Sequence, residues 1–201
     1  MRLLFAIAII ILSGGSPGAS KPSVVFDGDS ITVLATPAIH QLLDPRYDVD
    51  VLGVIGIRIN QSLPALQSAL KLHPDAVVVN LGTNDALQGG EHPDWVSGWD
   101  KLIRITRNTP CVVLTTINPA ADALSHRPIA KRINAAIRRL AAQHPMKYKV
   151  ADWSGFLSRN VRNQRTYLRP EPILIHPTPA GAEKLVTLDQ RALAKCGTRT
   201  S

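Results

Sequence analysis

The chain has 201 residues, of which 45% are hydrophobic and 19% are charged, and its formal net charge is +8. This length allows one domain with a real core, and the composition excludes a disordered, collagen-like or coiled-coil protein. The positive charge favours an anionic environment, although a solvated basic surface is the simpler explanation. The basic residues are scattered, with loose clusters only at Arg138-Arg139 and Arg159 to Arg169. Because aromatic stacking platforms are lacking between them, we expect no nucleic-acid partner.

The first 20 residues have the pattern of a secretory signal peptide. Arg2 precedes an unbroken apolar run at 3–12, and small residues follow at 13–20. We therefore expect a signal peptide over 1–20, a single mature domain over 21–201, and a secreted or cell-envelope location. The apolar run is shorter than the roughly 20 residues that span a bilayer, so no stable membrane insertion is expected. An uncleaved N-terminal anchor is the alternative.

Short β-branched runs alternate with amphipathic stretches through the rest of the chain. In chain order, the patterns predict a strand at 23–26, a helix at 35–43, a strand at 48–54, a helix at 61–72, a strand at 75–81, a helix at 95–107, a strand at 111–117, a helix at 128–143, a strand at 148–151 and a helix at 180–195. Continuous apolar strands separated by amphipathic helices are typical of a parallel sheet covered on both faces. The predicted fold class is α/β, a three-layer α/β/α sandwich with a five-stranded parallel, flavodoxin-like sheet.

The chain contains two cysteines, Cys111 and Cys196. A disulfide between them would close a loop of about 86 residues and stabilise the fold by about 4–5 kcal/mol in the chain-entropy model. Such a bond fits an oxidising compartment. Two unpaired thiols are the alternative, because the sequence does not give their separation.

Three loops at the carboxyl edge of the predicted sheet, where ligands of such sheets bind, carry candidate site residues. Gly28-Asp29-Ser30 follows the first strand, and Ser30 would lie where the next helix begins, as a nucleophile or as an N-cap. Gly56 follows the second strand and allows a backbone amide to approach a substrate, or simply makes a turn. Asn84 follows the third strand and either donates to an oxyanion or satisfies its own turn.

His176 is the candidate general base. It lies in His176-Pro177-Thr178-Pro179, a stiff segment just before the last predicted helix. The other histidines lie in or near predicted helices or their ends, without matching donors, and are better explained as surface or capping residues. They are His40, His73, His92, His126 and His144.

Together these segments resemble the SGNH (GDSL-type) serine hydrolase family of esterases and lipases. The resemblance rests on four blocks that occur in the family's order, each after the predicted element that should carry it. They are Gly28-Asp29-Ser30, Gly56, Gly82-Thr83-Asn84-Asp85 and His176-Pro177-Thr178.

The resemblance implies a role for each matching position. Ser30 attacks the acyl carbon, and His176 takes the serine proton and later returns it to the leaving alcohol. The oxyanion is held by the backbone amides of Ser30 and Gly56 and by the side chain of Asn84. Asp29 and Asp85 fix their turns. Water hydrolyses the acyl-enzyme, and neither a cofactor nor a metal is needed.

The chain departs from the family at the residue that usually orients the histidine. The family has an aspartate three residues before the histidine, whereas this sequence has Ile173, which cannot accept a hydrogen bond. His176 then works in a dyad, or Glu171 serves as a possible orienting acid, or the site binds without turnover. We favour the dyad, because the nucleophile, the oxyanion donors and the base are all retained.

The leading functional hypothesis is a secreted esterase or deacetylase that hydrolyses a small acyl ester of a small molecule, lipid or carbohydrate. An O-acyltransferase would use the same acyl-enzyme and pass the acyl group to a sugar hydroxyl. A non-catalytic envelope protein that binds an acylated glycan or lipid is the alternative from a different class, and Ile173 is the residue that keeps it open.

Overall fold

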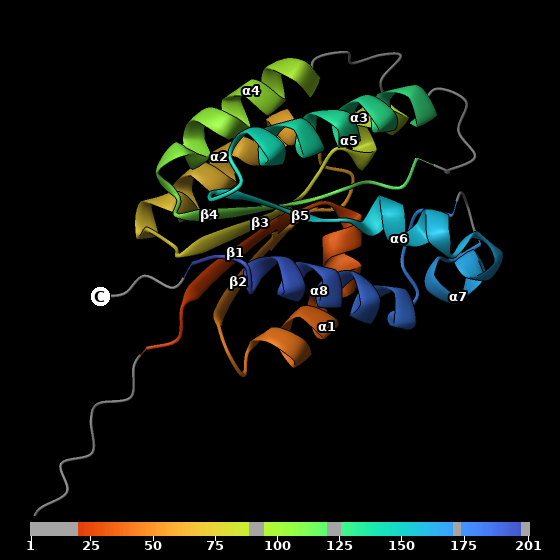
Figure 1. Ribbon diagram of the computed structural model, residues 1–201, viewed down its shortest axis with the longest axis horizontal. Coiled ribbons are helices and arrows are strands. Elements are labelled where there is room, and N and C mark those ends of the chain that lie inside the picture. The colour runs from red at the N-terminus through yellow and green to blue at the C-terminus, as the bar shows by residue number, and fades with distance from the viewer. Residues whose placement is uncertain (1–19, 89–94, 120–125, 171–173, 198–201) are drawn as a thin grey trace, which may run out of the picture.

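A computed structural model describes residues 20–88, 95–119, 126–170 and 174–197 of the chain. Its centre is a five-stranded, all-parallel sheet with the strand order β2-β1-β3-β4-β5 (Figure 1). This is the doubly wound, flavodoxin-like order, and it confirms the predicted fold class. The strands are β1 (Ser23–Gly28), β2 (Asp48–Gly53), β3 (Ala76–Asn80), β4 (Cys111–Thr115) and β5 (Tyr148–Ala151).

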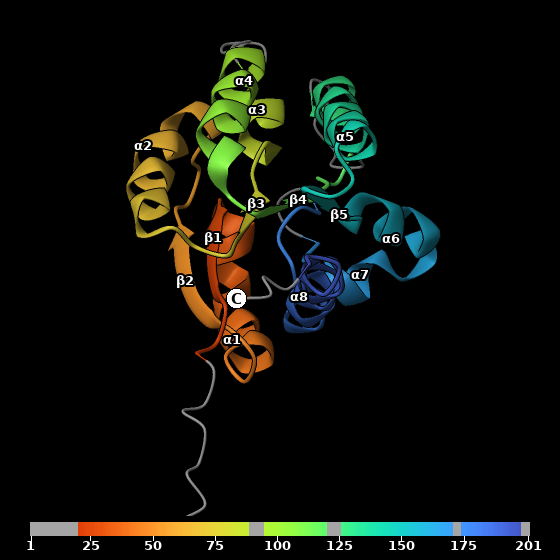
Figure 2. The same cartoon turned by 60° about the vertical axis from the view of Figure 1, so that its left-hand side comes forward.

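The longer helices cover both faces of the sheet, as Figures 1 and 2 show. On one face lie α1 (Ser30–Leu43) and α8 (Pro179–Leu193), and on the other lie α2 (Ile59–Ala69), α4 (Trp95–Ile105) and α5 (His126–Gln143). Shorter elements are α3 (Thr83–Leu87), α6 (Trp153–Arg159), α7 (Gln164–Tyr167) and the 3₁₀ turns Leu70–Leu72, Thr106–Asn108 and Val161–Asn163. Within the described residues, no helix is long and apolar enough to cross a membrane.

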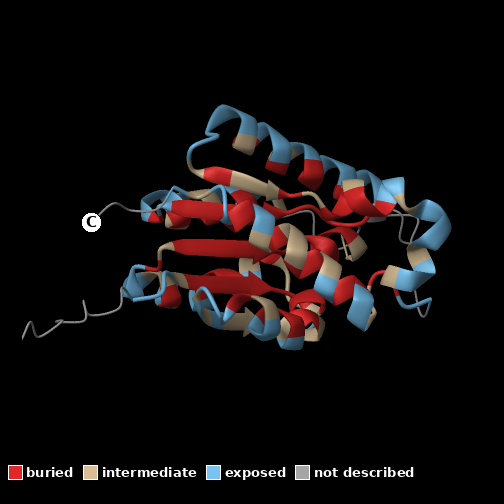
Figure 3. Ribbon diagram, turned by 60° about the horizontal axis from the view of Figure 1, so that its bottom comes forward, coloured by how far each residue is buried: buried red, intermediate tan, exposed pale blue. Residues whose placement is uncertain are grey.

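Alternate residues of each central strand serve two separate cores. In β3, Val78 packs with the α1 and α8 side of the sheet, while Val77 and Val79 pack with the α2, α4 and α5 side. All three valines are buried, and Figure 3 shows the central strands as the buried centre of the molecule. The two faces together explain why these strands are continuous apolar runs and not alternating ones.

The predicted elements occur in the predicted order, with one instructive error at the first helix. We predicted a start at Ala35, but α1 begins at Ser30, because the side chain of Asp29 accepts a hydrogen bond from the amide of Ile31 at 2.9 Å and caps the helix. The short helices α3, α6 and α7 were not predicted, since none is long enough to show a periodic apolar face.

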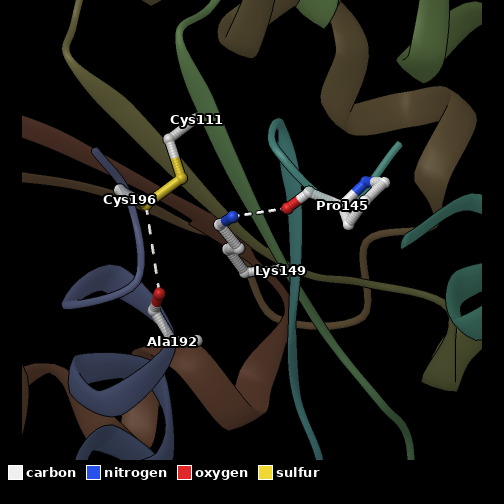
Figure 4. Close-up of a disulfide and its surroundings, with 5 residues drawn as sticks. All are labelled: Cys111, Pro145, Lys149, Ala192 and Cys196. Atoms are coloured by element: carbon white, nitrogen blue, oxygen red, sulfur yellow. Dashed lines mark hydrogen bonds between the residues drawn. A yellow bond between two sulfur atoms is a disulfide. The ribbon is translucent and has the colours of Figure 1, made fainter. Parts of the chain in front are cut away.

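A disulfide joins Cys111, the first residue of β4, to Cys196, just after α8 (Figure 4). Their Cα atoms are 5.8 Å apart, within the usual range for a disulfide. The structure therefore supports the bridged alternative over the two free thiols. The bond ties the end of α8 to the amino edge of the sheet, opposite the loops that carry the candidate site.

Candidate active site

Ser30 stands at the first position of α1, directly after β1 and its Asp29 cap. Because Asp29 performs the capping, the Ser30 hydroxyl is not used as an N-cap. Instead, Oγ of Ser30 lies 3.0 Å from Nε2 of His176, a residue 146 positions later in the chain. As a first-turn residue, Ser30 also has a backbone N–H without an intrahelical acceptor. A hydroxyl in this position can lose its proton to the imidazole and attack a carbonyl carbon beside free amides.

Three buried carboxyl groups lie beneath this turn, and their bonds are structural. Ser62 Oγ donates to both carboxylate oxygens of Asp27, at 2.6 and 2.5 Å. The amide of Ile59, at the start of α2, donates to Asp85 at 3.0 Å. The side chain of Asp29 caps α1 through the amide of the second helical residue. These acids therefore fix helix starts and strand ends, as expected for Asp29 and Asp85, and none of these bonds is made to His176.

Burial weakens the acidity of two of these groups. It raises the pKa of Asp27 to about 6, against the lowering effect of the Ser62 hydrogen bond. It raises the pKa of Asp29 to about 7, and the nearby charges of Asp85 and Asp27 add to that effect. Near neutral pH, Asp29 therefore binds a proton in part of the molecules, which limits the negative charge next to the serine.

Asn84 links the serine turn to the loop after β2. Its carrier helix, α3, starts at Gly82, whose φ of 113° lies in the left-handed region that favours glycine. The buried Asn84 amide donates from Nδ2 to the carbonyl oxygen of Ile57 at 3.1 Å and to Oδ2 of Asp29 at 3.4 Å. Its amide nitrogen is thus held beside the serine turn by tertiary contacts and does not satisfy its own turn.

Gly56 lies in the same loop, one residue before Ile57. The loop is joined to the serine turn by the bond from the Val54 amide to the carbonyl of Gly28, at 3.0 Å. Gly56 is exposed and has a φ of 76°, and a Cβ atom there would touch nothing within 4 Å. Its backbone conformation, and not crowding, therefore requires glycine. The structure brings the loops of all three predicted oxyanion donors to one edge of the sheet.

The segment that carries His176 is bound by its backbone to the end of α7. The amide of Arg169 donates to the carbonyl of His176 at 2.8 Å, and the amide of Thr178 donates to the carbonyl of Tyr167 at 3.0 Å. Leu168 and Pro177, which lie between these bonds, form an isolated antiparallel bridge. The backbone is therefore fixed by main-chain bonds from His176 itself to Thr178.

A third support comes from the loop after β4. Nδ2 of Asn118 donates to the carbonyl of Leu174 at 3.0 Å, and Leu174 has a φ of 47°, which is unusual for a residue with a side chain. The sequence analysis did not single out Asn118, although it follows the fourth strand just as Asn84 follows the third. A polar side chain at that edge was the available signal.

The surroundings of the imidazole favour its neutral form. Partial burial lowers the pKa of His176, and the positive charge of Arg169 lowers it further. Within the described residues, the ring makes one hydrogen bond, to the Ser30 hydroxyl. The proposed orienting acid Glu171 and the substituted position Ile173 lie outside the described residues. Neutral imidazole is the form that accepts a proton, so these effects suit a general base.

No group of three or more His, Cys, Asp or Glu side chains that could hold a metal ion occurs in the part of the chain that the structure describes.

Comparisons with known proteins identify the family of the chain. Residues 26–184 match the GDSL-like lipase/acylhydrolase family. No curated protein sequence matches the chain. Among solved structures, the chain is similar to a lipase/acylhydrolase from Enterococcus faecalis, with a TM-score of 0.71, 20% identity and coverage of 90% of this chain and 100% of that one.

Two further similar structures are of enzymes whose names give a carbohydrate-containing substrate. Axe2, an acetylxylan esterase from Geobacillus stearothermophilus, has a TM-score of 0.67 and 15% identity over 90% of this chain and 98% of that one. The catalytic domain of a Streptococcus pneumoniae peptidoglycan O-acetyltransferase has a TM-score of 0.65 and 18% identity over 87% of this chain and 93% of that one. At these identities the likeness shows a shared fold, whereas the family match spans most of the sequence. The chain therefore belongs to the GDSL-like lipase/acylhydrolase (SGNH hydrolase) family of carboxylic ester hydrolases, as its four sequence blocks predicted.

Proposed function

We propose that this protein is a secreted serine esterase or deacetylase that removes a small acyl group through an acyl-enzyme formed on Ser30. The observation that carries the proposal is the 3.0 Å contact between Oγ of Ser30 and Nε2 of His176. It joins two of the four sequence blocks from opposite ends of the domain. An imidazole with a lowered pKa, hydrogen-bonded to a serine hydroxyl, is the arrangement that activates a weak nucleophile.

The reaction proceeds in two balanced steps. In acylation, Oγ of Ser30 bonds to the ester carbonyl carbon while its proton moves to Nε2 of His176. The bond from carbon to the alcohol oxygen then breaks, and the alcohol leaves with that proton. In deacylation, water gives a proton to His176 and adds to the same carbon, after which the acid leaves and Ser30 regains its proton.

The developing negative charge is stabilised by the amides of Ser30 and Gly56 and by Nδ2 of Asn84. Each comes from a different loop, and the bonds of Asn84 to Ile57 and to Asp29 tie these loops together. The 3.1 Å bond to Ile57 fixes the Asn84 amide, and the proton on the longer 3.4 Å contact to Asp29 turns to the oxyanion when charge develops.

His176 acts in a dyad in this proposal. The main-chain bonds to Arg169 and Tyr167 and the Asn118 bond to Leu174 position its segment, and none of these bonds involves an acidic side chain. Glu171 remains the candidate for a displaced third member. A Glu171→Gln substitution separates the two forms, since the dyad predicts little change in kcat and an orienting acid predicts a large loss.

Two observations support export. The first 20 residues follow the pattern of a signal peptide, so we propose that the mature domain begins near residue 21 and is secreted or bound to the cell envelope. The disulfide between Cys111 and Cys196 is of the kind that persists in oxidising compartments.

Acyl transfer to a sugar hydroxyl is a second candidate activity. It is favoured by the shared fold of the peptidoglycan O-acetyltransferase domain, and the same acyl-enzyme serves both outcomes. Turnover of 4-nitrophenyl acetate with and without a saccharide acceptor distinguishes them. Formation of acetylated saccharide at the expense of free acetate would indicate a transferase.

The decisive experiment follows short-chain 4-nitrophenyl esters and covalent fluorophosphonate labelling in the wild type, Ser30→Ala and His176→Ala. We expect both substitutions to lower kcat by at least about 10³-fold, and labelling to disappear in Ser30→Ala. Ser68→Ala and His40→Ala are matched controls, because both side chains are exposed on helices outside the site. A wild type that neither labels nor turns over would contradict the proposal and favour the non-catalytic binding protein.

A further inference from the structure

The segment that supports His176 is unusually basic. Residues 153–170 contain four arginines and no aspartate or glutamate. All four are exposed and recur every three or four residues. They lie in α6, in the 3₁₀ turn that follows it, in α7 and directly after the bridge residue Leu168. We call them the arginine segment: Arg159, Arg162, Arg165 and Arg169.

One end of the arginine segment reaches the candidate site. The backbone amide of Arg169 donates to the carbonyl of His176 at 2.8 Å, and its Nε donates to the carbonyl of Pro177 at 3.1 Å. Its charge is also close enough to lower the pKa of His176. The other arginines lead away from the site along α7 and α6, which lie side by side at the right in Figure 1.

Among the residues that the structure describes, acidic side chains compensate these positive charges poorly. Arg159 lies 3.8 Å from Asp152, but the same carboxylate is bound more closely by Arg138, at 2.7 Å. Arg162 and Arg165 form no ion pair with any acidic residue in the described part of the chain. Exposed charges of one sign beside a reactive site raise the local concentration of oppositely charged substrate.

We propose that the arginine segment binds the anionic groups of a polymeric substrate, so that the natural substrate is an acylated polysaccharide carrying carboxylate or phosphate groups. This inference rests on the proposed function and names its substrate class. Guanidinium groups pair with carboxylate and phosphate in a two-bond geometry that favours this chemistry over a neutral glycan. A small ester bound in the site could contact only Arg169, whereas a polysaccharide with repeated negative charges can contact the other three arginines as well.

The kinetic test compares an anionic and a neutral polymer on the same enzyme. The substrates are O-acetylated polygalacturonate and acetylated galactomannan, each measured as kcat/KM relative to 4-nitrophenyl acetate in the same preparation. The variant is Arg162→Gln/Arg165→Gln, which leaves Arg169 and its bonds to the His176 segment in place. The matched control, Arg191→Gln/Lys195→Gln, removes two exposed charges near the disulfide at the opposite edge of the sheet.

We expect the Arg162→Gln/Arg165→Gln variant to lower relative kcat/KM on acetylated polygalacturonate about three- to tenfold, and the control to change it by less than about twofold. The wild-type value should also fall with added salt, and less steeply in the variant. On acetylated galactomannan, the variant and the control should behave alike. Equal ratios for both polymers in all three proteins would overturn the proposal.

A binding measurement keeps this inference separate from the proposed function. Polygalacturonate and inorganic polyphosphate, which carry no ester, are titrated into the wild type, the variant and the control. Weaker binding of one or both polymers only in the variant supports the arginine segment even if no ester is turned over, and shows whether carboxylate or phosphate is preferred. Equal binding by all three proteins argues against it.

Because Val161 is 63% exposed within the same segment, the test includes a lipid surface. The three proteins are sedimented with phosphatidylglycerol vesicles. Vesicle binding that depends on Arg162 and Arg165, without any matching effect on the polymers, would overturn the polysaccharide proposal in favour of a membrane surface.

Discussion

The two halves of the candidate site are supported in different ways. On the serine side, buried side chains fix the turn: Asp29 caps α1, Ser62 bonds to Asp27, and Asn84 joins Asp29 to the next loop. On the histidine side, main-chain bonds to Arg169 and Tyr167 fix the segment around His176. The position of Ser30 therefore depends on which side chains surround its turn, and the position of His176 depends on where the backbone of α7 and α8 lies.

In the proposed dyad, this difference would let the backbone position the imidazole without the aspartate that the family usually has. Bonds at the carbonyl of His176 and the amide of Thr178 restrict the backbone from the histidine onward, and the Asn118 bond to the carbonyl of Leu174 restricts it two residues earlier. They leave the ring itself with its contact to Ser30. If the two halves are positioned independently, a displacement of α7 or of the start of α8 should disturb only the position of His176. A substitution of Asn84 should disturb only the serine turn and its oxyanion donors.

The largest expected effect is on stability, from removing the disulfide at the far end of α8. Cys111→Ser/Cys196→Ser opens a loop of about 86 residues, so we expect the free energy of unfolding to fall by about 4–5 kcal/mol in urea titrations. Because the His176 segment is also held by α7, kcat on 4-nitrophenyl acetate should fall by no more than about threefold where the variant is folded.

A large loss of kcat in the folded disulfide variant would contradict this separation. It would mean that the position of α8 is transmitted to His176 from its far end, and that the main-chain bonds near the histidine are insufficient. Wild type treated with a reductant under the same conditions is the control for effects of the serine substitutions themselves.

The second effect tests the serine half. Asn84→Ala removes the proposed side-chain oxyanion donor, so we expect kcat to fall about 10²- to 10³-fold, or about 3–4 kcal/mol in transition-state stabilisation, with KM little changed. Asn163→Ala, at an exposed position, is the control. A loss confined to stability or to KM would instead show that Asn84 acts only as a link between Ile57 and Asp29.

Much of the serine half could be predicted because its signals are local in sequence. Gly28 ends β1 and is followed directly by Asp29 and Ser30, and Gly82 and Asn84 follow β3, the neighbour of β1 in the sheet. The start of α1 was misplaced because the apolar pattern becomes regular only after the first turn, although the Asp29 cap was present in the sequence.

The histidine half could be predicted only as far as the position of His176. Its support comes from main-chain bonds to residues 167–169 and from Asn118, which lies 56 positions from its partner Leu174. Main-chain bonds leave no residue type to recognise, and α7 is too short to give a periodic pattern. Distant backbone pairing is thus the information that the sequence does not display.

The third prediction perturbs the histidine half directly. A Cβ at Gly181 would lie 1.9 Å from the carbonyl oxygen of Tyr167 and 3.2 Å from Pro177, so Gly181→Ala must displace α8 or the bridge next to it. We expect a loss of about 1–3 kcal/mol in the free energy of unfolding and a fall in kcat of up to about 10²-fold. Gly197→Ala, where a Cβ meets nothing within 4 Å, is the control.

Retention of full kcat in Gly181→Ala, with its stability lowered, would show that the His176 segment tolerates movement of its support. The serine half would then position the pair on its own, through the Ser30 hydroxyl. Restored activity at high substrate concentration would point to binding and not to the imidazole.

The smallest expected effect concerns the charge beside the imidazole. Burial is the larger cause of the lowered pKa of His176, and the Arg169 charge is the second, so Arg169→Gln should raise that pKa while leaving it below the ordinary 6.5. Because His176 must be neutral to accept the serine proton, the acidic limb of the profile of kcat/KM against pH should move to higher pH. The pH dependence of the rate of fluorophosphonate labelling should shift in the same direction, since both reactions require the same neutral imidazole.

The control is Arg165→Gln, which removes an equal charge that does not contribute to the lowered pKa of His176. The acidic limb of its profile should therefore coincide with that of the wild type. A shift of both variants together would assign the effect to the overall field of the basic segment, and an unshifted Arg169→Gln profile would mean that burial alone sets the protonation of this histidine.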